Sequence, residues 1–590
     1  MKKKLLFPLS LLAILALGGC SVKTNSGNTN TDQNYGADYD FNKTIEVEEP
    51  QDIEVTETDS EFEISTEDGE FTQSGSVYTL SKAGTYSVSG KLNGQIVVEA
   101  GDDDEVVIEL NGVSITCDSD SPIKVISGSK LEISAKKNTD NIIKDNRKAK
   151  TTDIASQGEG AISADIDLKL KGTGTLVVTG NYNNGVHTSK DLTIQKMTLK
   201  ATGYNNALKG KDSVTITSGA IQAYALTGNG IKTDDSDVSK KGNQRGIITI
   251  NGGTVYVDSL HDAIDASYNI VVDETDDEVS TKLTVKAGTN SSNYNKSTFK
   301  ADSEKGLKAA NEIVINKGTV VIATSDDAIH ANYGTALENE STGLGNITIN
   351  DGLIQVASGD DGLHADNTLT INGGKIVVTG STEGYEANYI NILGGYSYIY
   401  GTDDGVNCSK KSFNNCAFTM SGGYLDVAVR SGDTDGIDSN GNFTLSGGAI
   451  VTRGSPGTNL SGMSTGLDVD GTISMTGGTL IAFNGLEKSP TASSTIKYAG
   501  TSGANTSMGG NPGGQGGPRR AYSSSSSVSL AAGNYTLSGT GLDISFTNDY
   551  VYGSFQIYSS YLTSGSSYTL ARDNSTVLSW SQSSNSVTIS

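Results

Sequence analysis

Short runs that alternate apolar and polar residues, interrupted by turn signals, fill most of this chain. Segment 369–378 is typical and reads Leu-Thr-Ile-Asn-Gly-Gly-Lys-Ile-Val-Val. Alternation with a period of two predicts half-buried strands, and the Gly-Gly pair predicts a tight corner between them. Each repeat of this pattern is therefore expected to hold at least two short strands and a corner.

A second phrase marks the repeat itself and is called the anchor phrase below. It reads Asp-Asp-Gly-Leu-His-Ala at 360–365, Glu-Gly-Tyr-Glu-Ala at 383–387 and Asp-Asp-Gly-Val-Asn at 403–407. Copies recur about every 22 residues, a period that indicates a solenoid of stacked coils. With β-branched strands and no helix-period run, the pattern predicts an all-β, single-stranded solenoid, a parallel β-helix. In each phrase the small residue suits a corner, the next residue points inward and the third points outward.

The pattern also divides the chain. Residues 1–20 combine a lysine cluster, an apolar run and Gly-Gly-Cys, which predicts a signal peptide too short to span a membrane. Polar residues 21–50 read as a disordered tether. We expect N-terminal strands that cap the solenoid over 51–150, regular coils over 151–490, a Gly/Ser/Pro-rich linker over 491–525 and a C-terminal β segment over 526–590.

The ending Leu-Gly-Gly-Cys at 17–20 resembles a bacterial lipobox, in which Cys20 becomes the lipidated N-terminus. This resemblance implies a protein held on the extracellular face of the bacterial membrane by its lipid alone. Of the remaining cysteines, Cys408 and Cys416 lie close in sequence, and the choice between a disulfide and two reduced thiols stays open.

The formal net charge of -25 limits the kinds of molecule that this protein can bind. Nucleic acid is excluded, because phosphate binding needs clustered lysine and arginine. Acidity that gathers in Asp pairs instead suggests hard cations bound by oxygen ligands.

The acidic residues of the anchor phrases form one column when the coils are stacked. Adjacent coils bring carboxylates to within about 5 Å of one another, and calcium, which takes six to eight oxygens at about 2.4 Å, would relieve their repulsion. An Asp that merely caps its own turn is the alternative. The predicted calcium ligands are Asp262, Asp265, Asp326, Asp327, Asp360, Asp361, Glu383, Glu386, Asp403, Asp404, Asp435 and Asp438.

Histidines and tyrosines supply candidate sugar contacts. His330 and His364 occupy the outward third position of the anchor phrase. By alternation Tyr398 and Tyr400 point out of the following strand, where a ring can stack on a pyranose face, and Tyr385 lies in an anchor phrase of the same region. Ordinary surface histidines and strand tyrosines are the alternative.

Catalysis has weaker support. Polysaccharide lyases built on this kind of helix need a base, commonly arginine, beside a calcium-bound uronate. Arg430, near Asp403, Asp404 and Asp433 in sequence, is the best placed candidate, with Arg453 next. A single arginine beside acids is more often an ion pair.

Three segments resemble a known family. The opening at 84–98, the segment Leu-Asn-Gly-Val-Ser-Ile at 110–115 and the ending at 562–570 are similar to the carbohydrate-binding domain-containing β-helix proteins of anaerobic bacteria. The resemblance implies a right-handed, pectate-lyase-like β-helix that binds calcium and adheres to plant cell-wall polysaccharide, both cellulose and acidic pectin. The family's calcium carboxylates carry over only as the Asp and Glu of the anchor phrases.

The sequence therefore predicts a monomeric, non-catalytic, lipid-anchored protein that binds plant cell-wall polysaccharide with the help of Ca2+. Two alternatives remain, a calcium-dependent pectate lyase that uses Arg430 and a structural surface adhesin with a protein partner.

Overall fold

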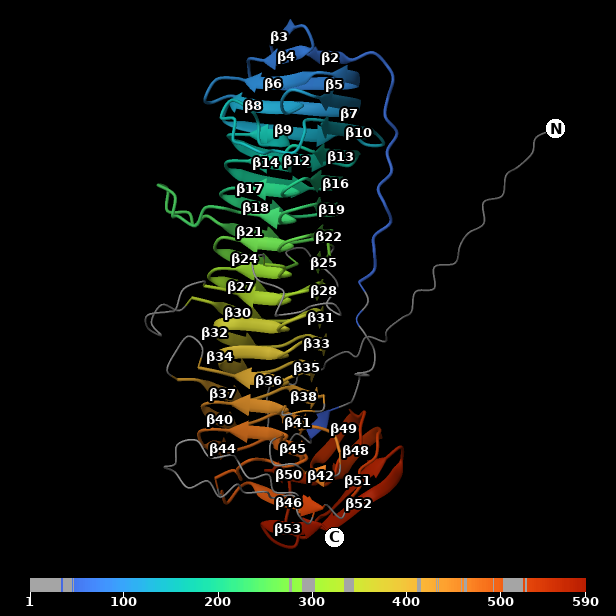
Figure 1. Ribbon diagram of the computed structural model, residues 1–590, viewed down its shortest axis with the longest axis vertical. Helices are drawn as coiled ribbons and strands as arrows, with labels where there is room; N and C mark the ends of the chain where they lie inside the picture. The colour runs from blue at the N-terminus through green and yellow to red at the C-terminus, as the bar shows by residue number, and fades with distance from the viewer. Residues whose placement is uncertain are drawn as a thin grey trace, which may run out of the picture.

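The computed structural model describes most of the chain as stacked strands (Figure 1). The described residues are 33–35, 45, 47–274, 279–288, 303–333, 344–410, 415–430, 432, 434–457, 459–460, 464–491, 493–501, 524–525 and 528–589. Every regular element in these ranges is a β-strand. The same ranges contain no helix that is long and apolar enough to cross a membrane.

One coil consists of three strands, for example β14 (Asn184–Thr188), β15 (Asp191–Gln195) and β16 (Met197–Gly203). Each pairs in parallel with its counterpart in the next coil, β17 (Leu208–Gly210), β18 (Ser213–Ile216) or β19 (Gly219–Ala225). Repetition of this pairing builds three parallel sheets around one interior. The prediction of an all-β chain of stacked parallel strands is confirmed.

Sheet 1 contains the anchor phrases, sheet 2 follows it in each coil, and sheet 3 follows the Gly-Gly corner. The other strands of sheet 1 are β4 (Val77–Leu80), β6 (Gln95–Glu99), β8 (Ile123–Ser127), β11 (Gly160–Ala164), β20 (Ile231–Lys232), β23 (Ile264–Ala266), β26 (Leu307–Ala309), β29 (Ile329–Ala331), the first parts of β32 (Leu363–Ile371) and β34 (Tyr385–Ile392), β36 (Val406–Cys408), β39 (Ile437–Ser439) and β43 (Leu467–Val469).

Sheets 2 and 3 run beside it for the length of the stack. Sheet 2 also holds the first parts of β5 (Gly84–Asn93) and β7 (Glu105–Cys117), whose ends belong to sheet 3, and β9 (Lys130–Ala135), β12 (Asp167–Gly172), β21 (Ile247–Ile250), β24 (Asn269–Val272), β27 (Glu312–Ile315), β30 (Asn346–Ile349), the ends of β32 and β34, β37 (Ala417–Met420), β40 (Asn442–Leu445) and β44 (Ile473–Met475). Sheet 3 also holds β10 (Asp140–Asp145), β13 (Thr175–Gly180), β22 (Gly253–Ser259), β25 (Thr281–Ala287), β28 (Thr319–Thr324), β31 (Leu353–Ala357), β33 (Lys375–Gly380), β35 (Tyr396–Gly401), β38 (Tyr424–Val429), β41 (Ala449–Arg453) and β45 (Thr479–Phe483).

The interior follows from the alternation. Inward aliphatic residues such as Ile329, Leu363 and Val406 are fully buried and stack along the axis, coil on coil. At the Gly-Gly corner, Asn372 donates to Asn350 and Asn350 donates to Asn316, each at 2.7 Å between Nδ2 and Oδ1. Polar side chains at the corner thus satisfy one another between coils.

Both ends of the stack are covered. At the N-terminal end, β2 (Glu63–Thr66) and β3 (Phe71–Ser74) pair antiparallel with β5 and β4. At the C-terminal end, β50 (Phe555–Ser559) pairs antiparallel with β45 and with β46 (Lys497–Thr501), and β53 (Ser586–Ile589) pairs with β46. Antiparallel covering strands block the addition of further chains to the open edges.

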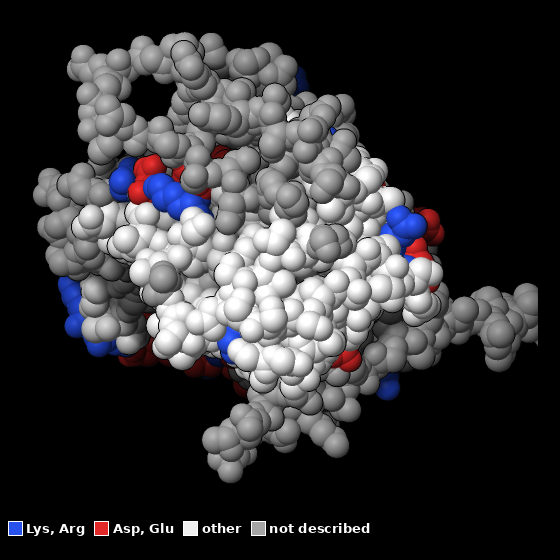
Figure 2. Space-filling model, turned by 90° about the horizontal axis from the view of Figure 1, so that it is seen from below, with Lys and Arg blue, Asp and Glu red and all other residues white. Residues whose placement is uncertain are grey.

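A five-stranded sheet, called the C-terminal module, lies beside the last coils (Figure 1). Its strands, in order, are β1 (Gln33–Tyr35), β49 (Leu542–Asn548), β48 (Gly533–Gly539), β51 (Ser567–Arg572) and β52 (Ser575–Ser581). A separate short pair joins β42 (Asn459–Leu460) to β47 (Ser524–Ser525). From below, the C-terminal end of the molecule is mostly uncharged among the described residues (Figure 2).

The structure departs from the expected boundaries at several places. Residues 497–501, expected in a linker, form β46 within the C-terminal cover, and β7–β9 pairing already extends parallel coils into the region expected to be a cap. In the expected tether, Glu49 lies on sheet 3, where its carboxylate accepts from Lys286 Nζ and from the Tyr256 hydroxyl, both at 2.5 Å. Charged partners elsewhere in the chain, which composition cannot reveal, hold this segment.

Candidate functional site

The acidic residues of the anchor phrases do form one column, and several of them accept a backbone N–H from the next coil. Asp361 N–H donates to Asp327 Oδ1 at 3.0 Å, and Glu383 N–H donates to Asp361 Oδ1 at 3.2 Å. Earlier coils use asparagine in the same way, since Asn206 N–H donates to Asn184 Oδ1. One side-chain oxygen of each such residue therefore bridges two coils, which is part of the reason that Asp and Asn occur here.

Lysines neutralise the earlier half of the column. Lys308 Nζ lies 2.9 Å from Asp262 Oδ2, and Lys232 Nζ lies 2.6 Å from Asp265 Oδ2. The sequence prediction placed both carboxylates among calcium ligands, but in the structure an ammonium group supplies their positive charge.

The same holds one coil further along. Lys305 Nζ lies 2.8 Å from Asp326 Oδ2 and 2.6 Å from Asp327 Oδ2. Burial by itself lowers the pKa of Lys305, but Asp327 and Asp326 outweigh that effect and raise it. This buried ammonium contacts both aspartates, which the sequence predicts as calcium ligands.

The centre of the column has a different composition. Asp360, Asp361 and Glu383 each offer an oxygen, and these oxygens lie within 4.8 Å of one another. Two ligands on opposite sides of a calcium ion are about 4.8 Å apart, since each Ca–O distance is about 2.4 Å. Burial, followed by the charges of Asp327 and Glu383, raises the pKa of Asp361 well above its ordinary value. An oxygen-only group that resists ionisation without a counter-charge fits a hard cation.

The two histidines lie directly beside this group. The rings of His330 and His364 stack with centroids 4.1 Å apart. His330 Nδ1 lies 2.7 Å from Asp327 Oδ2, and His330 Nε2 lies 3.1 Å from Asp366 Oδ1. Burial lowers the pKa of His330, but the two carboxylates outweigh burial and raise it.

The predicted outward position of these histidines is therefore only partly right. The side chains of His330 and His364 are only 8% and 14% exposed, because the two rings stack on each other and their nitrogens lie near carboxylates. Glu386, which shares the register position of His364 in the next coil, is fully buried, and its Oε2 lies 3.3 Å from His364 Nδ1.

The last part of the column gathers carboxylates around Asp404 and Asp435. Burial and neighbouring acids raise the pKa of Asp404 to about 8, of Asp435 to about 7 and of Asp438 to about 6. Within the described residues, however, no group of three close donor atoms includes these residues or Asp403. The structure thus brings Asp360, Asp361, Glu383 and Glu386 together but leaves this later group more open.

The three tyrosines predicted as sugar contacts are buried in this structure. Tyr385 is 0% exposed, lies in the coil interior and bonds to Ser397 Oγ at 2.8 Å. Tyr398 and Tyr400 do leave sheet 3 on its outer face, but they are 1% and 8% exposed because they belong to the apolar cluster that joins sheet 3 to the C-terminal module. Alternation correctly gave the direction of these two rings and could not reveal what covers them.

The catalytic candidates also change. Arg430 is exposed, and its guanidinium lies 5.7 Å from the centre of the Tyr400 ring. Asp433 lies outside the described residues. Arg453 is fully buried, forms an ion pair with Asp426 and donates to Asn548 Oδ1 at 2.7 Å, so it joins the module to the coils.

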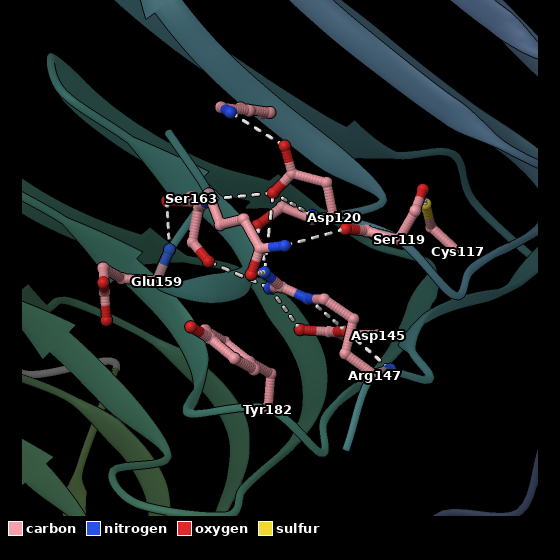
Figure 3. Close-up of polar contacts among 12 residues, drawn as sticks. Cys117, Ser119, Asp120, Asp145, Arg147, Glu159, Ser163 and Tyr182 are labelled. Atoms are coloured by element: carbon pink, nitrogen blue, oxygen red, sulfur yellow. Dashed lines mark hydrogen bonds and ion pairs between the residues drawn. The ribbon is translucent and has the colours of Figure 1, made fainter. Parts of the chain in front are cut away.

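Sequence reasoning missed a polar groove of about 630 Å³ at the earlier coils. One wall comes from the insertion between β10 and β11, held by Arg147, which pairs with Asp145 and stacks on Tyr182 at 3.9 Å (Figure 3). Lys150 of this insertion contacts Glu159 at 2.7 Å. The lining adds amides and hydroxyls from Thr151, Thr152, Asn183, Asn205 and Thr227, with Tyr204 and His187. The long insertion between β10 and β11 was the feature of the sequence that could have indicated this groove.

Comparison with known proteins finds similar sequences. A family model described as carbohydrate-binding domain-containing protein matches residues 74–340 and 334–450. A carbohydrate-binding domain-containing protein of Acetivibrio thermocellus is 32% identical over 285 residues, which is 47% of this chain and 91% of that protein. A solved structure of a polysaccharide lyase-like protein from C. thermocellum, a gadolinium derivative, matches with 32% identity and a TM-score of 0.32 over 35% of this chain and 81% of its own. The chain belongs to the family of carbohydrate-binding domain-containing proteins.

Proposed function

We propose that this protein binds acidic plant cell-wall polysaccharide, without catalysis, through calcium held at the centre of the acidic column. The observation that carries the proposal is the oxygen-only group of Asp360, Asp361 and Glu383. Asp360 and Glu383 are partly exposed, so a cation there would have one side open to a uronate carboxylate. Calcium, when bound, would bridge the protein carboxylates and the sugar acid. The family membership supports carbohydrate as the ligand.

The scaffold and the location are part of the same proposal. The coils are proposed to wind as a right-handed, pectate-lyase-like β-helix, and the chain is proposed to act as a monomer. Cys20, which lies outside the described residues, is proposed to carry the lipid. Pairing of Gln33–Tyr35 with β49 supports an attachment beside the C-terminal module, because only residues 21–32 would then separate lipid and body. The test is fractionation of Cys20→Ala, which should leave the membrane fraction.

Retention on polygalacturonate and on cellulose, with calcium and with chelator, tests the binding function. Residues 21–590 should be retained on polygalacturonate only with calcium. Asp361→Asn should lose that retention while it keeps the acceptor for Glu383 N–H. The matched control is Asp351→Asn, an exposed aspartate outside the column. Retention on neither polymer would refute the proposal and favour a protein partner, and release of unsaturated uronide that absorbs in the ultraviolet would favour a lyase.

A further inference from the structure

One group of close donor atoms in the column combines an imidazole with two carboxylates. Among the described residues, four groups of three close donors lie along the column, and Lys305 contacts Asp326 and Asp327, which occur in two of them. The oxygen-only group of Asp360, Asp361 and Glu383 is the calcium candidate above. The fourth group consists of Asp361, His364 and Glu386.

These three residues converge from two adjacent coils. Asp361 precedes β32, His364 lies in β32, and Glu386 lies in β34. His364 Nδ1 is 2.9 Å from Asp361 Oδ2 and 3.3 Å from Glu386 Oε2. The side chains are 4%, 14% and 0% exposed, so the group is more enclosed than the calcium candidate.

This group includes a nitrogen donor, whereas the calcium candidate has only oxygen donors. Calcium takes oxygen ligands, whereas an imidazole nitrogen beside carboxylates suits zinc and similar transition metals. Asp361 belongs to both groups. Its Oδ1 accepts from Glu383 N–H, whereas its Oδ2 faces the imidazole, so the two oxygens serve different surroundings.

The surroundings of His364 match those of a metal-binding imidazole. Metal-ligating histidines are oriented by further carboxylates, backbone groups and packing. Here His330 stacks on His364, with 15° between the ring planes. His330 is itself held by Asp366 Oδ1 at 3.1 Å, and Asp366 Oδ2 accepts from Tyr333 N–H at 2.9 Å. This chain of contacts fixes the ring whose Nδ1 faces the two carboxylates.

We propose that Asp361, His364 and Glu386 bind one divalent transition-metal ion of the zinc class, at a site that shares Asp361 with the calcium candidate. His330 and Asp366 act as positioning residues. The site would join two coils next to the polysaccharide-binding group, and its existence does not depend on the proposed function.

Zinc content and zinc affinity test the site directly. Residues 21–590, which include every described residue, are freed of metal with chelator, loaded with zinc in excess calcium and desalted. Elemental analysis should find one zinc per chain. His364→Gln and Glu386→Gln should each lose it, whereas His187→Gln should keep it, because His187 has the same register position in an earlier coil but neighbours Asn184 and Lys209. Asp366→Asn should weaken zinc binding about 10- to 100-fold.

X-ray absorption of the zinc-loaded wild type provides a measurement that needs no variant. Scattering from an imidazole ring around the metal is expected. Zinc displaced by calcium, zinc with oxygen ligands only, or unchanged zinc affinity in a folded His364→Gln protein would overturn the proposal. Polysaccharide retention is not used, so failure of this site and failure of the proposed function are separate results.

Discussion

Replacement of Asp404 by asparagine tests whether the carboxylates of the column lower the stability of the metal-free protein. Asp404 Oδ1 accepts from Asp435 N–H at 2.8 Å, and an asparagine oxygen can accept the same bond. Earlier coils already use Asn184 and Asn206 in this role. The substitution therefore removes the ionisable group and keeps the link between coils.

The magnitude follows from the pKa of Asp404, which burial and neighbouring acids raise from 3.8 to about 8. At pH 7 the unfolded chain ionises this carboxyl, whereas the folded chain keeps it protonated. Each pH unit between 3.8 and 7 lowers the free energy of unfolding by about 1.4 kcal/mol, which gives about 4 kcal/mol as an upper limit. Because the folded-state pKa is raised, stability is lost as pH rises from about 4 to about 8.

The assay is urea unfolding in chelator at pH 4.5, 6 and 8. Asp404→Asn should be close to the wild type at pH 4.5 and increasingly more stable at higher pH. Asp404→Ala should instead lose about 1 to 3 kcal/mol at pH 4.5, since Asp435 N–H is left without that acceptor. The exposed Asp102→Asn is the control. A difference between the wild type and Asp404→Asn that does not change with pH would refute the reasoning.

Three further changes probe the parts that hold the molecule together. Arg453→Ala should lower the free energy of unfolding by about 3 to 5 kcal/mol in urea, because it leaves the Asp426 carboxylate buried without its cation; a loss below about 1 kcal/mol would contradict this. The hydrogen bond from Lys286 lowers the pKa of Glu49 below its ordinary value of 4.5, so the contact between them is present at neutral pH and is lost as acid protonates the carboxylate. Glu49→Gln should therefore raise hydrogen exchange of residues 47–54 at neutral pH, and this difference from the wild type should shrink as the solution is acidified. Tyr398→Phe should leave polysaccharide retention unchanged, since the ring is buried, and a loss of retention would restore this tyrosine as a sugar contact.

Much of the fold could be predicted because it is local and repeated. A period of two, a corner glycine pair and a repeat of about 22 residues specify strands and coil length, whatever lies elsewhere in the chain. Stacking then follows, since each coil can bury its aliphatic row only against the next. Asp361 and Glu383 were predicted as column neighbours for this reason, and their backbone link agrees.

Contacts between segments that are far apart in the chain could not be predicted from the sequence. Tyr400 reads as an exposed strand residue, yet its hydroxyl lies 3.1 Å from that of Tyr550, which is 150 residues away in the C-terminal module. Nothing in the sequence distinguishes Lys305 from other lysines, but its position one coil from Asp327 makes it a counter-ion of that carboxylate.

The sequence by itself determined the strand pattern, the stacking direction of the side chains and the alignment of acids into one column, because these depend on spacing within a coil. Only the tertiary structure decided which of these carboxylates contact a lysine or a histidine and which tyrosines the C-terminal module covers, since these partners come from other parts of the chain. Charge and burial at a site depend on everything within a few ångströms of it, and a repeat fixes only the neighbours that repeat.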